Sequence, residues 1–404
     1  MLLPYKQRRI YHSMPSVPRR PFSDEEYDQR LYAVRHSMWS HRLDTLVVTQ
    51  PENMFYLTNY HSPGVPLQML VVPLQGDVGI ATRLLESSNV TARTLAQSWP
   101  YDETTDAVSH FAHCLDRIGA ARVGYDATSM SHDFFCRMVE HTPGCSWVDM
   151  PRIVHNVRAC KSPAELVCIS KAATYVAAGY KAALKRIRTA AQCGYSCGLT
   201  ESEVAGCALA DMMRCGCEYA AYPLFVASGT NSCIGHHAAS RKAIQPDELV
   251  FIEIGGCHER YHAARMHTLF TGAEVPAWFT RVRALIFEAL EAGRAACRTG
   301  ARARDVDAAM REVVEPFLHT DERMYSRSGY AIGLGLTADW NDSDMLLIDG
   351  GSCGTLRDNM TIHLIPWCQK RSVGSIGFSD TVVVRPGGAT SILLCDVNDQ
   401  DILA

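Results

Sequence analysis

The stretch FIEIGGCHERYHAARMHTLF, residues Phe251–Phe270, predicts two strands joined by a short turn that contains Gly-Gly. Glu253 lies in an otherwise apolar run within the first strand. A buried carboxylate costs several kcal/mol unless it is paired, hydrogen-bonded or protonated. Two interpretations follow: Glu253 is a structural acid bonded to backbone or to a nearby arginine, or it is a functional acid in a cleft.

The bulk composition is that of an ordinary globular protein. The chain has 404 residues, which favours two domains, and its 39 basic and 43 acidic residues leave a net charge of −4. We therefore expect no nucleic-acid partner and no membrane partner. No apolar run approaches the roughly 18 to 20 residues that span a bilayer.

Residues 1–23 carry basic side chains and prolines but no acid. An organellar transit peptide is one interpretation, but the prolines interrupt any amphipathic helix, so we expect a flexible basic tail. Sixteen cysteines without a secretory signal indicate reduced thiols and a cytoplasmic location.

Residues 24–158 alternate between helical and strand patterns, which predicts a small α/β domain. Ser23 and Glu26 form the pattern of a capping box, and the helix after them places Tyr27, Leu31, Val34 and Met38 on one face. The runs LDTLVVT, MLVVPL and VGIAT read as strands.

A long helix is predicted to open the second domain, residues 159–404. Ser162 suits its N-cap, Pro163 its first position and Glu165 its third. Two more helices are predicted at 278–298 and 304–318, and further strands at 359–367 and 378–384. Helices mixed with strands in this order predict an α+β domain.

The order of these motifs resembles the pita-bread family, which includes methionine aminopeptidases, prolidase, aminopeptidase P and creatinase. The motifs are RLDTLVVTQPENMFYLTNY, RACKSPAELVCISKAA, EIGG…RYHAARMHT, SGYAIGLGL, LRDNMTIHLIPW and GFSDTVVV. The resemblance implies a creatinase-type N-terminal α/β domain followed by a C-terminal pita-bread domain, an α+β fold overall. It also implies a homodimer in which one subunit's N-terminal domain approaches the other's cleft.

Metallopeptidases of this family hold two divalent metals with two Asp, one His and two Glu. The matching positions here are Glu253, Ala264, Tyr330, Ile365 and Ser379. Alanine and isoleucine cannot bind a metal, and tyrosine and serine are poor ligands for the usual divalent ions. We therefore expect neither a metal site nor another cofactor.

Within the family the chain is most similar to the ectoine-hydrolase branch, whose glutamate at the position of Glu253 is understood to attack a cyclic amidine. Such chemistry also needs a proton donor, and His236 and His237, in SCIGHHAAS, lie where the branch carries a catalytic histidine. His237 is slightly preferred, and a solvated pair is the alternative. Tyr330 and His363 are further candidates, each with a competing interpretation as a core residue.

The substrate expected is a small molecule, and aromatic side chains suit a cationic or zwitterionic one. The candidate binding residues are Tyr56, Tyr261, His262, Asp339, Trp340 and Ser379. A creatinase-type catalytic glutamate is missing, because Met266 holds its place, and Arg265 and His267 also depart from the branch.

The sequence therefore predicts a metal-independent hydrolase of C–N bonds in a small cyclic amidine or amide. One alternative is a binding or scaffold protein that has lost its activity. Others are a Xaa-Pro peptidase with a rebuilt metal site and a creatinase-like amidinohydrolase.

Overall fold

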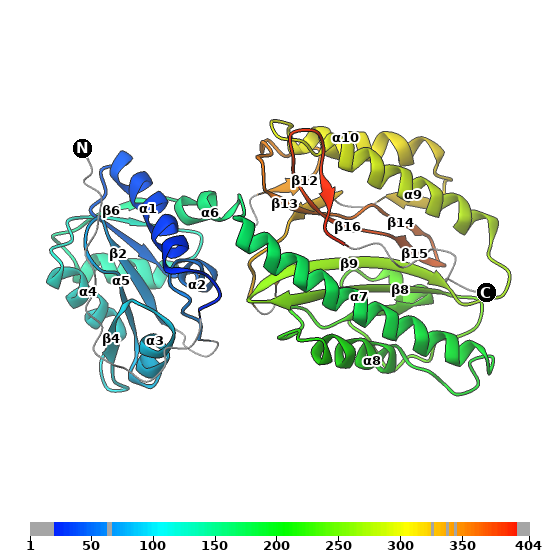
Figure 1. The fold of residues 1–404 in the computed structure, drawn as a ribbon, viewed down its shortest axis with the longest axis horizontal. Helices are drawn as coiled ribbons and strands as arrows, with labels where there is room; N and C mark the ends of the chain where they lie inside the picture. The colour runs from blue at the N-terminus through cyan, green and yellow to red at the C-terminus, as the bar shows by residue number, and fades with distance from the viewer. Residues whose placement is uncertain (1–19, 63–66, 325–326, 337–338, 343–345, 394–404) are drawn as a thin grey trace. The chain divides into compact units, whose positions relative to one another are not determined.

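In the computed structural model the chain divides into two compact units, Met1–Val157 and Arg158–Ala404. The structure describes residues 20–62, 67–324, 327–336, 339–342 and 346–393 (Figure 1). Most of the predicted basic tail, residues 1–19, lies outside this range.

The first unit is built on a mixed sheet with the order β4-β3-β2-β1-β5-β6. Strand β2 runs antiparallel to both of its neighbours, β1 and β3, and the other three pairs of the sheet are parallel. The strands are β1 Thr45–Val48, β2 Met69–Pro73, β3 Gly79–Arg83, β4 Gln97–Tyr101, β5 Arg122–Tyr125 and β6 Ser146–Asp149. The helices are α1 Asp24–Ser40, α2 Pro51–Thr58, η1 Leu84–Glu86, α3 Ser87–Arg93, α4 Ala107–Arg117, α5 His132–His141 and α6 Ile153–Arg158.

Helix α1 begins as predicted, with the Ser23 side chain accepting a hydrogen bond from the Glu26 backbone N–H. The predicted buried face was wrong at one position, because Arg30 is buried and Leu31 is only partly buried. The Arg30 guanidinium donates to the Tyr56 carbonyl and packs on the rings of Phe22 and Tyr56. These contacts make its burial favourable despite its charge.

The second unit begins with the predicted cap. Ser162 and Glu165 form a reciprocal capping box, and Pro163 starts a helix that runs to Ala191. The helices of this unit are α7 Pro163–Ala191, α8 Glu201–Arg214, η2 Gly229–Cys233, α9 Ala277–Ala296, α10 Ala303–Val314 and η3 Glu315–Phe317.

The strands of the second unit form three sheets, with the orders β7-β8-β9, β12-β11-β13-β16-β17 and β10-β14-β15. Helices α7 and α8 cover β7–β9 on one side, and α9 and α10 lie on the far side of the strands (Figure 1). The strands are β7 Phe225–Ser228, β8 Leu249–His258, β9 Tyr261–Phe270, β10 Glu322–Met324, β11 Gly329–Ala331, β12 Leu347–Ile348, β13 Thr361–Leu364, β14 Trp367–Lys370, β15 Gly374–Gly377, β16 Asp380–Val383 and β17 Thr390–Ser391.

The central hairpin turns at Glu259 and Arg260, not at the glycines. Both residues have positive φ, 49° and 67°, as a tight two-residue hairpin requires, and their backbone N–H groups donate to Glu218. Gly255 and Gly256 lie inside β8 instead. A Cβ on Gly255 would come within 2.5 Å of the Trp340 ring, so this glycine leaves room for the tryptophan.

Candidate active site

Glu253 lies at the centre of the β7-β8-β9 sheet. It stands opposite Phe225 of β7 and opposite Met266 of β9. Directly opposed residues in antiparallel strands share one face, so these three side chains lie together. The opposite face, with Ile252 and Ile254, packs on α7 and α8. The face of the sheet that carries Glu253 is therefore turned away from helices α7 and α8.

The Glu253 side chain is buried. The residue is 8% exposed, and none of the described residues donates a hydrogen bond to its side chain. Burial raises its pKa to about 7, and the positive charge of Arg327 partly offsets that rise. A carboxyl group with a pKa near neutrality suits a general base or a nucleophile at physiological pH.

A hydrogen-bonded chain lines the same region. His363 Nδ1 lies 3.0 Å from the Tyr330 hydroxyl, and His363 Nε2 lies 2.7 Å from Ser379 Oγ. Trp340 Nε1 donates to the Tyr330 oxygen at 2.8 Å, and the Met266 backbone N–H donates to Ser379 Oγ at 2.7 Å. Burial lowers the pKa of His363 to about 3, so its imidazole is neutral.

The tautomer of His363 decides where the phenol proton points. If Nδ1 carries the ring proton, the Tyr330 oxygen accepts from both Trp340 and His363. The phenol O–H is then free to donate to another group. Burial and the charge of Glu253 both raise the pKa of Tyr330 well above its usual value, so the phenol keeps its proton.

We call Tyr222, Phe225, Tyr330 and Trp340 the aromatic cluster. The Tyr222 and Trp340 rings meet edge to face at 4.6 Å, and Phe225 lies 6.3 Å from Trp340. Asp339 holds the edge of this cluster, because the Tyr222 hydroxyl donates to its carboxylate at 2.8 Å.

A buried ion pair fixes the segment that carries Trp340. Arg158 donates to Asp342 Oδ1 at 2.9 Å, and Lys161 bonds to the other carboxylate oxygen. These two cations hold the pKa of Asp342 below its usual value despite complete burial. The pair stabilises the turn that places the tryptophan against Gly255.

The two neighbouring histidines turn in different directions. The His236 ring lies 5.6 Å from Phe225 and therefore borders the aromatic cluster. His236 has a positive φ of 55°. His237 Nε2 instead faces the buried Glu201 carboxylate at 3.6 Å. The placement thus favours His236 over His237, the reverse of the sequence preference.

Glu201 organises the loop that carries both histidines. It is fully buried and accepts hydrogen bonds from Ser228, Asn231 and Ser240. These bonds lower its pKa against the effect of burial. One carboxylate of α8 therefore fixes three points of the segment from 228 to 240.

Three predicted binding residues have other partners. Tyr261 points to the helical face, where its hydroxyl donates to Glu165 at 2.6 Å, so it does not reach Glu253. His262 Nδ1 lies 3.2 Å from the Gly333 carbonyl, and burial lowers its pKa to about 4. Tyr56 is buried within the first unit against Arg30. A role of Tyr56 at the cleft stays a prediction.

The residues at the five family ligand positions do not supply a two-metal site. Ala264 and Ile365 are apolar and belong to one packed group with Tyr330 and Trp340. Tyr330 and Ser379 are already joined through His363. Glu253 alone offers a carboxylate, whereas two divalent ions need several anionic ligands.

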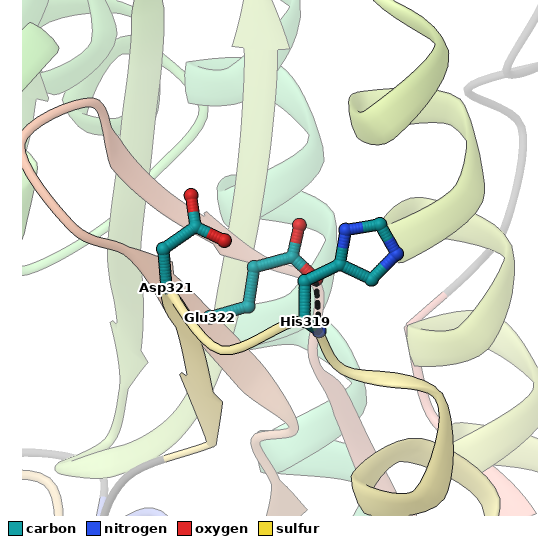
Figure 2. A group of neighbouring side chains, drawn as sticks. All are labelled: His319, Asp321 and Glu322. Atoms are coloured by element: carbon teal, nitrogen blue, oxygen red, sulfur yellow. Dashed lines mark hydrogen bonds between the residues drawn. The ribbon is translucent and has the colours of Figure 1, made fainter.

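In the described residues, one group of three potential ligands lies close together: His319, Asp321 and Glu322, before and at the start of β10 (Figure 2). Arg281 donates to both carboxylate oxygens of Glu322, and Lys370 donates to Asp321 at 2.6 Å. The His319 backbone N–H also donates to Glu322, as the dashed line in Figure 2 shows. Two cations thus already neutralise these acids, and the group is an ion-pair network.

Sequence reasoning missed Tyr222, Phe225, Glu201 and Arg327. The run YAAYPLF before β7 gave an aromatic signal for the first two. Nothing in sequence spacing marks Glu201 or Arg327, because their partners lie far away in the chain.

The fold and the site together define a two-domain hydrolase architecture of the creatinase and prolidase type. Residues 167–386 match Metallopeptidase family M24, and residues 30–160 match the Creatinase/Prolidase N-terminal domain. The chain belongs to family M24, which confirms the predicted family and fold.

Relatives within this group have different activities. The ectoine hydrolase of Halomonas elongata is 24% identical over 404 aligned residues, which cover 92% of this chain and 96% of that protein. A Xaa-Pro dipeptidase of Pyrococcus horikoshii is 20% identical over an alignment that covers 90% of this chain and 96% of that protein. The solved prolidase from Pyrococcus horikoshii superimposes with a TM-score of 0.78 at 18% identity. The superposition covers 90% of this chain and 98% of the prolidase chain.

No helix within the described ranges combines the length and apolarity that crossing a membrane would require.

Proposed function

We propose that this protein hydrolyses a C–N bond in a small cyclic amidine or amide, without a metal. The observation that carries the proposal is Glu253: a buried carboxyl group without a hydrogen-bond donor among the described residues, on the face bordered by aromatic rings. A carboxyl group in this position gains stabilising contacts when a cationic substrate binds. The similarity to an ectoine hydrolase over most of the chain supports the same reaction class.

The chemistry requires three functions. Glu253 attacks the amidine carbon or removes a proton from the attacking water, and both routes need its ionised form. When Glu253 acts as a base, water adds to the carbon, the ring C–N bond breaks and the leaving nitrogen takes a proton. When Glu253 is the nucleophile, the ring C–N bond breaks first with protonation of the leaving nitrogen, and water then displaces the Glu253 carboxylate from the carbon. His236 supplies that proton, because a protonated imidazole is a general acid and the ring borders the cluster. Tyr330 orients the reacting group through its hydroxyl.

Metal independence is part of the proposal. The His363 bridge between Tyr330 and Ser379 and the apolar side chains of Ala264 and Ile365 support it. The similarity to Xaa-Pro dipeptidases favours the competing reaction, cleavage of a Xaa-Pro peptide with bound metal. Loss of activity with retention of binding is the other alternative.

Turnover of ectoine, creatine and Xaa-Pro dipeptides by the purified protein tests these three functions. We expect ring opening of the cyclic amidine, unchanged after exhaustive chelation, and no stoichiometric metal by elemental analysis. Glu253→Gln should abolish turnover without unfolding the protein, and Glu288→Gln, an exposed position on α9, is the matched control. Dipeptide cleavage that requires metal would establish the peptidase, and binding without turnover would establish the inactive protein.

A cytoplasmic homodimer completes the proposal. Light scattering of the purified protein should give twice the mass of one chain, and a monomeric mass with full activity would contradict the dimer.

A further inference from the structure

Arg327 is a charged side chain beside the site that has no ionic partner in the described part of the chain. Its Cζ lies 4.8 Å from the centroid of the Tyr330 ring. No described carboxylate forms an ion pair with it, and it donates no hydrogen bond to a described residue. The residue is partly exposed, so its guanidinium can reach a bound molecule.

The backbone at Arg327 is held firmly. The next residue, Ser328, is fully buried, and its hydroxyl bonds to Asp307 of α10. The Ser328 N–H donates to Ile348 at 2.7 Å, and its carbonyl accepts from the Ile365 N–H at 2.8 Å. These three bonds fix Ser328 and so anchor the backbone next to Arg327, whose guanidinium lies over the Tyr330 ring.

Glu253 and Arg327 are close enough to interact but do not touch. The arginine charge lowers the pKa of the Glu253 carboxyl group, yet the two side chains do not form an ion pair. Opposite charges at a buried site normally close into a hydrogen-bonded pair, because each alone is costly. Here the Tyr330 ring holds the guanidinium, and the two charges stay apart with the aromatic cluster beside them.

We propose that Arg327 is a specificity-determining residue that binds the carboxylate of the substrate. The substrate is then a small zwitterion, with its cationic ring at Glu253 and the aromatic cluster and its carboxylate at Arg327. This inference rests on the proposed function, because it assigns the second half of the same substrate. A guanidinium offers two parallel donors that match the two oxygens of a carboxylate.

The same arrangement disfavours other ligands. A molecule with a positive charge only would gain the contact with Glu253 but would meet the unpaired guanidinium as well. Rejection by a like charge is an effective source of specificity. A bipolar ligand instead pairs both protein charges at once.

Calorimetric titration with two ring compounds tests this inference. The first is ectoine, a cyclic amidinium that bears a carboxylate, and the second is the same methylated tetrahydropyrimidine ring without its carboxylate. We expect the wild-type protein to bind ectoine about 10 to 100 times more tightly, the range of one charged hydrogen-bonded contact. Arg327→Met should lose this preference, and Arg327→Lys should keep part of it.

Arg304→Met, at an exposed arginine on α10, is the control and should keep the full preference. Equal binding of the two rings by the wild-type protein, or binding of neither, overturns the inference. So does a preference that survives in a folded Arg327→Met variant. If that variant does not fold, the ratio measured with Arg327→Lys decides in the same way.

Turnover separates this inference from the proposed function. A clear preference for ectoine without ring opening would overturn the proposed hydrolysis and leave the role of Arg327 standing. Ring opening of both compounds at equal efficiency would support the hydrolysis and overturn the role of Arg327.

Discussion

His363 Nδ1 lies 3.0 Å from the hydroxyl oxygen of Tyr330, so a neutral imidazole joins two positions where metallopeptidases of the family carry metal ligands. Its other nitrogen reaches Ser379 at 2.7 Å. Tyr330, His363 and Ser379 therefore form a chain of neutral hydrogen-bonding groups. Glu253 brings a carboxyl group beside this chain, and no described residue donates a hydrogen bond to it.

Removing the Tyr330 hydroxyl should destabilise the protein. In Tyr330→Phe, Trp340 Nε1 and His363 Nδ1 both lose a buried partner. We expect the free energy of unfolding to fall by about 1 to 3 kcal/mol, the cost of leaving buried polar groups unsatisfied. Urea denaturation followed by tryptophan fluorescence measures this change. Tyr32→Phe, at an exposed tyrosine on α1, is the control, and equal stability of the two variants would contradict the bridge.

The activity should rise with pH through about 7. Glu253 acts in its ionised form, and burial raises its pKa to about 7. The kcat/KM profile of the wild-type protein reports this ionisation in the free enzyme.

The same profile should move when Arg327 is replaced. The Arg327 charge favours the ionised carboxylate, so Arg327→Met should raise the pKa of Glu253 further and shift the rise in activity to higher pH. A profile that stays in place, or one that moves to lower pH, would show that the two charges do not interact. Arg304→Met should leave the profile unchanged.

Replacement of His236 and replacement of His237 should have different effects on kcat. His236→Ala should lower kcat by about 100- to 10,000-fold, the usual effect of losing a general acid. His237→Ala should keep most of kcat, because His237 faces Glu201 and not the aromatic cluster. Added imidazole should restore part of the activity in the His236 variant alone. A reversed order would return the catalytic role to His237.

The sequence was informative where structure depends on local patterns. The Ser162 cap, the helix after Pro163 and the strand around Glu253 follow from residue spacing, and each is present. The Gly-Gly pair was misread as a turn, because glycine in a strand and glycine in a turn look alike until the packed neighbour is known. That neighbour, Trp340, lies 85 positions later in the chain.

The site was less predictable than the fold for a related reason. Glu253 could be identified because a charge in an apolar run is unusual whatever surrounds it. The different contacts of His236 and His237 depend on Phe225 and Glu201, and the placement of the Arg327 guanidinium over the Tyr330 ring also depends on tertiary packing. Such features arise from tertiary packing and leave no periodic signal in the sequence.

Glu253 should also cost the protein stability at alkaline pH. Its pKa is about 7 in the folded state and near 4.5 when exposed, so the folded protein binds the extra proton between these values. The stability that the protonated group contributes is complete below pH 4.5 and is lost as the pH rises through 7. The rise of the pKa from 4.5 to about 7 corresponds to about 3 kcal/mol in the free energy of unfolding.

Glu253→Gln removes this ionisation while keeping the shape of the side chain. The variant should therefore be more stable than the wild-type protein at pH 8, by up to about 3 kcal/mol, and the gap should close toward pH 5. Urea denaturation at the two pH values measures the gap, with Glu288→Gln as the control that should show none. A gap that widens at pH 5 would mean that the carboxyl group is stabilised as an anion in the folded state. It would then be a structural ion-pair partner, and the reactive role assigned to it would fail.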